Sequence, residues 1–241
     1  MAASILLNRS MTSGVVSLIS LLSLCVPSES HAASINGGFE TGFTGWTTIG
    51  DTSIKTAEFD SGPTQGTYEA LVTNSSGSIS APDLETFLGL ETGSLNDLGN
   101  GNTTNGSAIK QTFTANAGDV VTFDWNFVTN EEPKTVFNDF AFVSLNSSST
   151  LASTLSSSLV PFSAFTQQTG FQASSFTIPT TGTYTLGLGV SNVTDTTGDS
   201  GLLVDNVSLK PVPEPSSVLG TFVLGAIGAW SLLKRKQKSA S

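Results

Sequence analysis

The chain has 241 residues, a formal net charge of −10, one histidine and one cysteine. His31 and Cys25 both fall within the first 32 positions, so the rest of the chain can use neither Ser-His-Asp nor Cys-His catalysis and offers no histidine ligand for zinc. Residues 33–212 hold four lysines, no arginine and seventeen carboxylates, which gives a formal charge of about −13. We therefore expect this region to bind cations and not nucleic acid.

The first 32 residues have the pattern of a secretory signal peptide. Arg9 supplies the positive start, residues 15–26 form an apolar run, and Ser30-His31-Ala32 fits the small-x-small rule for cleavage. We therefore expect residues 1–32 to be removed during export, which leaves residues 33–211 as the exported domain.

The exported domain has the pattern of an all-β protein. In Val120–Val128 the alternate residues Val121, Phe123, Trp125 and Phe127 are apolar and share one face, and residues 184–190 repeat the pattern. Shorter candidate strands lie at 46–50, 68–73, 108–114, 140–145, 171–178 and 202–209. Eight or nine short strands over this length predict a two-sheet jelly-roll sandwich.

One short helix is expected at residues 82–90. Pro82 suits the first helical position, and Gly93 follows the end of the apolar pattern.

The tryptophans could serve as stacking platforms for sugar rings, but their positions favour the core. Trp125 shares its strand face with Phe123 and Phe127, and Trp46 follows Phe43 closely in GFTGW. Tyr68 is not a stronger candidate for sugar binding.

Two short motifs at the ends of the domain resemble galactose-binding-like jelly rolls, a group that includes many carbohydrate-binding modules. The first is Ile35-Asn36-Gly37-Gly38-Phe39-Glu40-Thr41-Gly42, and the second is Leu203-Val204-Asp205-Asn206-Val207-Ser208-Leu209. The resemblance implies that the first and last strands lie together and that a structural calcium ion is often held between them.

The residues themselves also favour calcium. Asp205 has the same strand parity as Val207 and Leu209, so we expect it to point inward, where an unpaired carboxylate costs several kcal/mol. With no arginine available, calcium is the natural partner, and Glu40 is the expected second carboxylate. Asn36 is expected nearby, and Asp199 is a weaker candidate; alternatively, Asp205 lies at a solvated strand end and binds no metal.

A polar segment between two predicted strands is a speculative ligand site. Asn130, Glu131, Asn138 and Asp139 cluster there, and they could form a second calcium site or a polar rim that contacts a ligand. The alternative interpretation is an acidic hairpin whose charge only keeps it soluble.

Residues 212–238 have the three parts of a sorting signal. The motif Val212-Pro213-Glu214-Pro215-Ser216-Ser217 precedes an apolar run at 218–233 and a basic tail at 234–238. This arrangement resembles the PEP-CTERM signal of bacteria that secrete exopolysaccharide, and the resemblance implies processing by an exosortase. The apolar run would reach ~24 Å as a helix against ~30 Å of hydrocarbon, so it predicts a thin membrane anchor with the basic tail on the cytoplasmic side. A plain single-pass anchor is the alternative.

These features predict an exported, non-catalytic protein that binds exopolysaccharide or another cell-surface glycan. The alternative is a glycoside hydrolase that uses two carboxylates, for which Asp124 and Glu131 are candidates. Ice binding is not expected, because no regular Thr-x-Thr ladder repeats along the chain.

Overall fold

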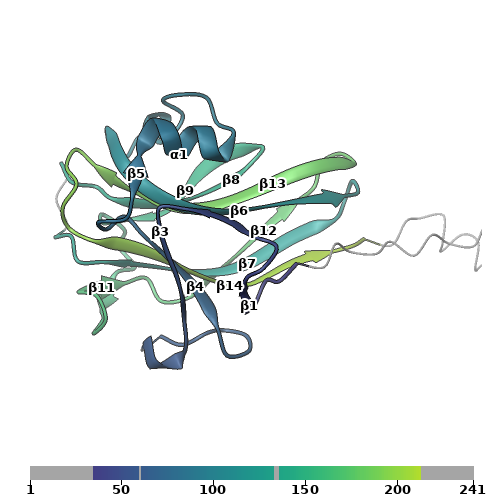
Figure 1. Cartoon of the computed structure of the whole chain (residues 1–241), viewed down its shortest axis with the longest axis horizontal. Helices are drawn as coiled ribbons and strands as arrows, with labels where there is room; N and C mark the ends of the chain where they lie inside the picture. Colours follow the sequence, from purple (N-terminus) through teal and green to yellow (C-terminus); the bar gives the residue numbers. More distant parts are fainter. Residues whose placement is uncertain (1–34, 60, 133–135, 213–241) are drawn as a thin grey trace, which may run out of the picture. The chain divides into compact units, whose positions relative to one another are not determined.

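A computed structural model describes residues 35–212 except Asp60 and residues 133–135 (Figure 1). All of these residues belong to one compact unit. The predicted signal peptide, anchor helix and basic tail lie outside the described residues.

About half of the described chain forms two antiparallel sheets, which face each other as a sandwich (Figure 1). In the seven-stranded sheet the order is β10 (Val160–Pro161), β11 (Gln167–Gln168), β7 (Val120–Thr129), β14 (Ser200–Lys210), β4 (Glu69–Thr73) and β3 (Asp51–Lys55), and β12 (Gln172–Thr177) also pairs with β7. In the six-stranded sheet the order is β2 (Thr47–Ile49), β6 (Thr103–Ala115), β13 (Gly182–Val193), β8 (Phe140–Leu145) and β9 (Ser147–Ser153), and β5 (Ile79–Ser80) also pairs with β6. The short strand β1 (Glu40–Phe43) lies outside both sheets. The predicted all-β, two-sheet jelly-roll sandwich is confirmed.

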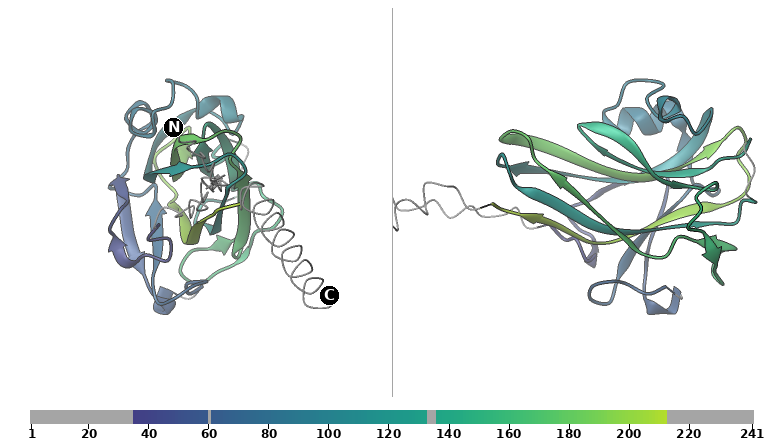
Figure 2. Two further views of the ribbon diagram at one scale, coloured as in Figure 1. Left: turned by 90° about the vertical axis from the view of Figure 1, so that its right-hand side faces the viewer. Right: turned by 180° about the vertical axis from the view of Figure 1, so that it is seen from behind.

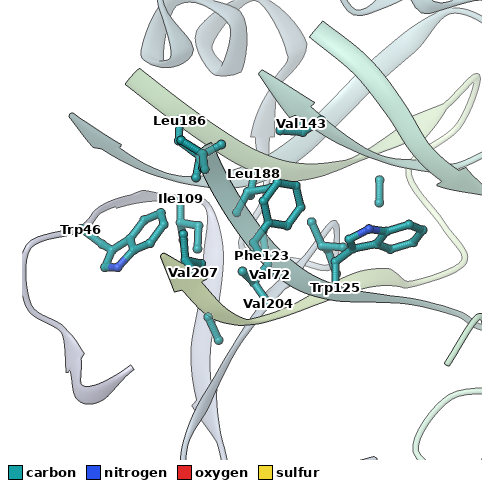
Figure 3. Packing of buried hydrophobic residues seen from close by; sticks show 14 of the residues in the cluster. Trp46, Val72, Ile109, Phe123, Trp125, Val143, Leu186, Leu188, Val204 and Val207 are labelled. Carbon is teal, nitrogen blue, oxygen red and sulfur yellow. The ribbon is translucent and has the colours of Figure 1, made fainter. Parts of the chain in front are cut away.

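The main core fills the space between the sheets, as Figure 3 shows. Alternate residues of β7 and β13 point into it, including Phe123, Leu186 and Leu188. Trp46 is 7% exposed and Trp125 is 8% exposed, so both tryptophans belong to the core as predicted. Neither indole ring is available for stacking on a sugar.

The outer face of the six-stranded sheet is partly covered by helix α1 (Ala81–Leu88; Figures 1 and 2). Ser80 caps its first turn and Pro82 lies in that turn, while Gly89 ends it in the left-handed conformation with a φ of 73°. The predicted helix therefore forms, but it begins one residue earlier and ends two residues earlier than expected. Leu84 and Leu88 pack onto Phe140 and Phe142 and form a second apolar cluster.

The outer face of the seven-stranded sheet has a cover of its own. Four phenylalanines from η1 (Ala57–Phe59) and from the loops that flank β11 pack over three apolar side chains of the sheet. The phenylalanines are Phe59, Phe162, Phe165 and Phe171, and the side chains beneath them are Leu71, Val128 and Leu203. The described residues between 35 and 212 thus supply both sheets and three apolar clusters, so this segment holds a core of its own and can be produced as a folded domain.

Candidate functional site

Three acidic side chains form a row across neighbouring strands on the outer face of the seven-stranded sheet. Asp205 of β14 is directly opposite Asp124 of β7, and the pairing of Val204 with Ala70 places Glu69 of β4 on the other side of Asp205. Side chains opposite each other in an antiparallel pair lie about 5 Å apart at Cβ. The row therefore concentrates negative charge on a small part of the sheet.

The outward direction of Asp205 corrects the prediction that it points into the core. Pairing between β14 and β7 shifts register between Asp205 and Ser208, and Asn206 has a φ of 51°. This bulge reverses the alternation of side chains. Figure 3 shows the consequence: Val204 and Val207 are three residues apart on β14, yet both side chains reach the core.

Asp205 is nevertheless fully buried, because the segment 64–68 covers it. One carboxylate oxygen accepts hydrogen bonds from the Gln65 backbone N–H at 2.7 Å and from the Thr64 hydroxyl at 3.1 Å, and the other accepts from the Asn206 N–H at 2.7 Å. Burial raises the pKa of Asp205, and these hydrogen bonds partly oppose the rise.

Asp124 shares a donor with Asp205. The Thr64 hydroxyl lies 2.8 Å from Oδ2 of Asp124 and 3.1 Å from Oδ2 of Asp205. A hydroxyl has one proton, so it can donate to only one of the two carboxylates at a time. The other carboxylate then relies on its remaining donors, which are the Asn206 amide at 3.1 Å for Asp124 and the backbone N–H groups for Asp205.

Glu69 is the functional candidate that the sequence analysis missed. Its side chain is fully buried, and both carboxylate oxygens have no hydrogen-bond partner. Burial, followed by the negative charge of Asp205, raises the pKa of Glu69 to about 7. An acidic residue inside the otherwise apolar stretch EALV was the available signal, because a carboxyl group on a buried strand needs a proton or a cation.

Asn36 and Glu40 take structural positions beside the row. The Asn36 amide donates to the carbonyls of Gly42 at 2.8 Å and Thr44 at 3.2 Å, so it closes the turn between them. Glu40 is exposed, and its Oε1 accepts from the backbone N–H groups of Thr67 at 2.7 Å and Tyr68 at 3.1 Å. Glu40 and Asp205 therefore hold the two ends of the same segment, 64–68.

The two ends of the domain do lie together, as the resemblance implied. The Val207 N–H donates to the Gly37 carbonyl at 3.0 Å. A Cβ atom at position 37 would lie 1.7 Å from the Val207 carbonyl oxygen, so only glycine permits this approach.

Asp199 cannot join Asp205 at one ion. Six residues of extended strand separate them, which places them about 20 Å apart. In the described part of the chain, no group of three acidic, histidine or cysteine side chains lies close enough to hold one metal ion.

The polar segment that precedes β8 makes buried hydrogen bonds to other parts of the fold. Asp139 is fully buried and accepts hydrogen bonds from the Asn74 amide at 2.9 Å, the Ser200 hydroxyl at 3.0 Å and the Val193 N–H at 3.0 Å. Burial raises its pKa to about 7. Asn138 is 8% exposed and bonds to Asn100, so these two residues do not form the ligand rim that was considered from the sequence.

The remaining members of this segment hold neighbouring loops. Asn130 accepts from the Thr166 N–H at 2.9 Å, and the Glu131 N–H donates to the Thr129 hydroxyl at 2.9 Å. Glu131 lies beyond the end of β7, seven residues and roughly 20 Å from Asp124. The pair proposed for glycoside hydrolysis is therefore not brought together across a groove.

Comparison with known proteins identifies the tail. A family model described as the PEP-CTERM protein-sorting motif matches residues 211–236. The chain carries a PEP-CTERM sorting motif. The match begins directly after β14 ends at Lys210, and such a motif indicates an exported protein that is processed by an exosortase. No helix within residues 35–212, as far as they are described, is long and apolar enough to cross a membrane.

Solved structures with a similar fold include carbohydrate-binding modules. TmCBM61 in complex with β-1,4-galactotriose has a TM-score of 0.43 and 17% identity over 76% of this chain and 100% of its own. The mannan-recognising module TmCBM27 has a TM-score of 0.36 and 13% identity over 70% and 90%. Tailspike protein 4 of bacteriophage CBA120 has a TM-score of 0.38 and 11% identity over 75% and 21%. No curated protein matches the sequence.

Proposed function

We propose that this protein is an exported, non-catalytic β-sandwich module that binds exopolysaccharide at the cell surface or in the extracellular matrix. The observation that carries the proposal is the sorting motif at residues 211–236, which follows the last strand of the sandwich without a linker. The folded domain is thus the cargo that the signal delivers.

Processing follows from the chemistry of the tail. The tail has prolines at 211, 213 and 215, a residue type that disfavours helix, and a protease acts on extended segments. The apolar run at 218–233 anchors the chain in the inner membrane until an exosortase cleaves near the motif. The domain then passes to the surface or the matrix.

The glycan contact is proposed at Tyr68. Its side chain is 38% exposed, and no other aromatic residue is among the exposed large hydrophobic residues of the described chain. An aromatic face stacks on a sugar ring, and the neighbouring Glu40 carboxylate accepts hydrogen bonds from sugar hydroxyls. Glu40 already bonds to the Tyr68 backbone, so the two groups are held close to each other.

A structural calcium ion is proposed at Glu69 and Asp205. Both side chains are fully buried, and the Glu69 oxygens lack any hydrogen-bond partner, so a divalent cation would supply what the two carboxylates need. The ion would neutralise two buried charges and fix the segment 64–68, which ends at Tyr68. Glu40 and Asn36, the ligands expected from the sequence, support this segment and its neighbouring turn instead.

The test is a binding isotherm of residues 33–212 with exopolysaccharide purified from the producing cells. We expect saturable binding that Tyr68→Ala weakens by about tenfold or more, the loss expected for one stacking aromatic ring. Thr114→Ala is the matched control, because Thr114 is exposed on β6 of the other sheet. Absence of binding by the unmodified domain would refute the glycan proposal, and release of reducing sugars would favour the hydrolase alternative.

A further inference from the structure

One continuous segment of the chain carries no charged residue. Between Asp139 and Asp195 the sequence contains no lysine, arginine, aspartate or glutamate. These residues build β8 to β13 in chain order. In a domain whose formal charge is about −13, the acidic residues are therefore confined to the rest of the surface and the interior.

Two edge strands of the sandwich, β12 and β9, belong to this uncharged segment. β12 pairs only with β7 and forms an edge of the seven-stranded sheet, and β9 forms an edge of the six-stranded sheet. β9 also lies close to β7, so the two edges share one side of the sandwich, which faces the viewer in the right-hand view of Figure 2. On the opposite side, edge strand β3 carries Asp51 and Lys55.

β12 lacks the features that protect the edges of sheets. Proteins usually place a charge, a proline or a bulge on an exposed edge strand, because its free N–H and C=O groups can pair with another chain. β12 has the sequence QASSFT, and all six residues pair with β7 in regular register. No other strand of the described chain pairs with it.

β9 is less open to a partner than β12. Its pairing with β8 shifts register, and its Thr150 accepts a hydrogen bond from the Asn100 amide at 2.6 Å. Exposed apolar side chains lie next to these edges: Leu155, just after β9, is 46% exposed, and Val160 of β10 is 49% exposed. An edge strand with one unpaired side, no charge and exposed apolar side chains next to it is suited to pairing with another polypeptide.

We propose that β12 pairs antiparallel with β12 of a second copy of this chain, which joins two seven-stranded sheets into one. The occupant follows from charge, since two copies of an acidic domain repel each other least when the uncharged segments of the two copies face each other. A short strand that pairs antiparallel with its own copy satisfies a two-fold axis, the commonest symmetry of dimers. Ser174 and Ser175 would lie nearest that axis.

Sedimentation velocity of residues 33–212 tests the proposal from low to high micromolar concentration. We expect a reversible dimer, which Ser175→Lys weakens at least about tenfold by placing two like charges near the axis. Thr114→Lys is the control: it adds the same charge at an exposed position of β6, which is paired there with Thr183 of β13 in the other sheet. It should leave the dimer intact or slightly tighter.

Hydrogen exchange locates the interface. Amide hydrogens of residues 172–177 should exchange more slowly at high concentration, whereas those of the opposite edge strand β3 should not change. A chain that stays monomeric at high concentration, or a dimer that Ser175→Lys leaves intact without protection of β12, would overturn the proposal.

Discussion

The pKa of Glu69 makes the stability of the domain depend on pH in a defined direction. Its folded-state value of about 7 lies above the ordinary value of 4.5. The unfolded chain therefore releases this proton near pH 4.5, while the folded chain keeps it until about pH 7. Stability from this group is complete below pH 4.5 and is lost as the pH rises through 7.

The Glu69→Gln variant should lose less stability than the wild type when the pH is raised, because glutamine does not titrate. In EDTA, urea unfolding should show a lower free energy of unfolding at pH 8 than at pH 5, and Glu69→Gln should reduce the difference by on the order of 1–3 kcal/mol. Asp139, whose pKa is also about 7, should leave a residual slope. Glu58→Gln is the matched control, because Glu58 is exposed. An equal pH dependence in wild type and Glu69→Gln would contradict the assignment.

Calcium should reverse this pH dependence if it binds at Glu69 and Asp205. The ion needs both carboxylates ionised, so protons compete with it and its stabilising effect should grow between pH 6 and pH 8. Thermal unfolding with calcium and with EDTA measures the effect. Glu69→Gln and Asp205→Asn should abolish the calcium shift, whereas Glu40→Gln should keep it. Loss of the shift in Glu40→Gln, with its retention in Glu69→Gln, would restore the ligands expected from the sequence.

Among the elements, the bulge in β14 decides which side chains enter the core. Asn206 adopts a φ of 51°, which glycine accepts without cost and a β-branched residue accepts poorly. Asn206→Gly and Asn206→Val both lose the hydrogen bond to Asp124, so their difference isolates the backbone strain. We expect the valine variant to be about 1–2 kcal/mol less stable than the glycine variant in urea unfolding. Equal stabilities would show that the bulge imposes no such restriction.

Helix α1 contributes an apolar cover whose loss can be measured. Leu84 is fully buried against the outer face of the six-stranded sheet. Leu84→Ala should lower the free energy of unfolding by about 2–5 kcal/mol, and Thr86→Ala, at an exposed position of the same helix, should have a much smaller effect. Similar losses in the two variants would indicate that α1 adds stability by its own helix formation rather than by packing.

The elements that follow local rules could be predicted, and those that depend on distant contacts could not. Strict alternation in residues 120–128 predicts β7, and Pro82 with its flanking residues predicts α1. The direction of Asp205 could not be predicted, because counting strand parity assumes an unbroken ladder. Glu69 was missed for a related reason: the carboxylate that it faces is Asp205, at the far end of the chain.

At the scale of the whole molecule, a charged edge strand and an uncharged edge strand lie at opposite edges of the seven-stranded sheet. Edge strand β3 carries Asp51 and Lys55, while the uncharged segment supplies the edge formed by β12. The proposed dimer would therefore form through β12.

Salt should therefore strengthen the proposed dimer. Two domains of about −13 repel each other at low ionic strength, and about 0.1 M salt reduces the range of that repulsion to roughly 10 Å. The strand pairing at β12 involves no ion pair that salt could weaken, so the dissociation constant should fall as sodium chloride is raised. Sedimentation velocity at low and moderate salt measures the trend. A dimer that dissociates as salt is added would require an interface built from ion pairs, which the uncharged segment cannot provide, and would place the contact on the acidic surface instead.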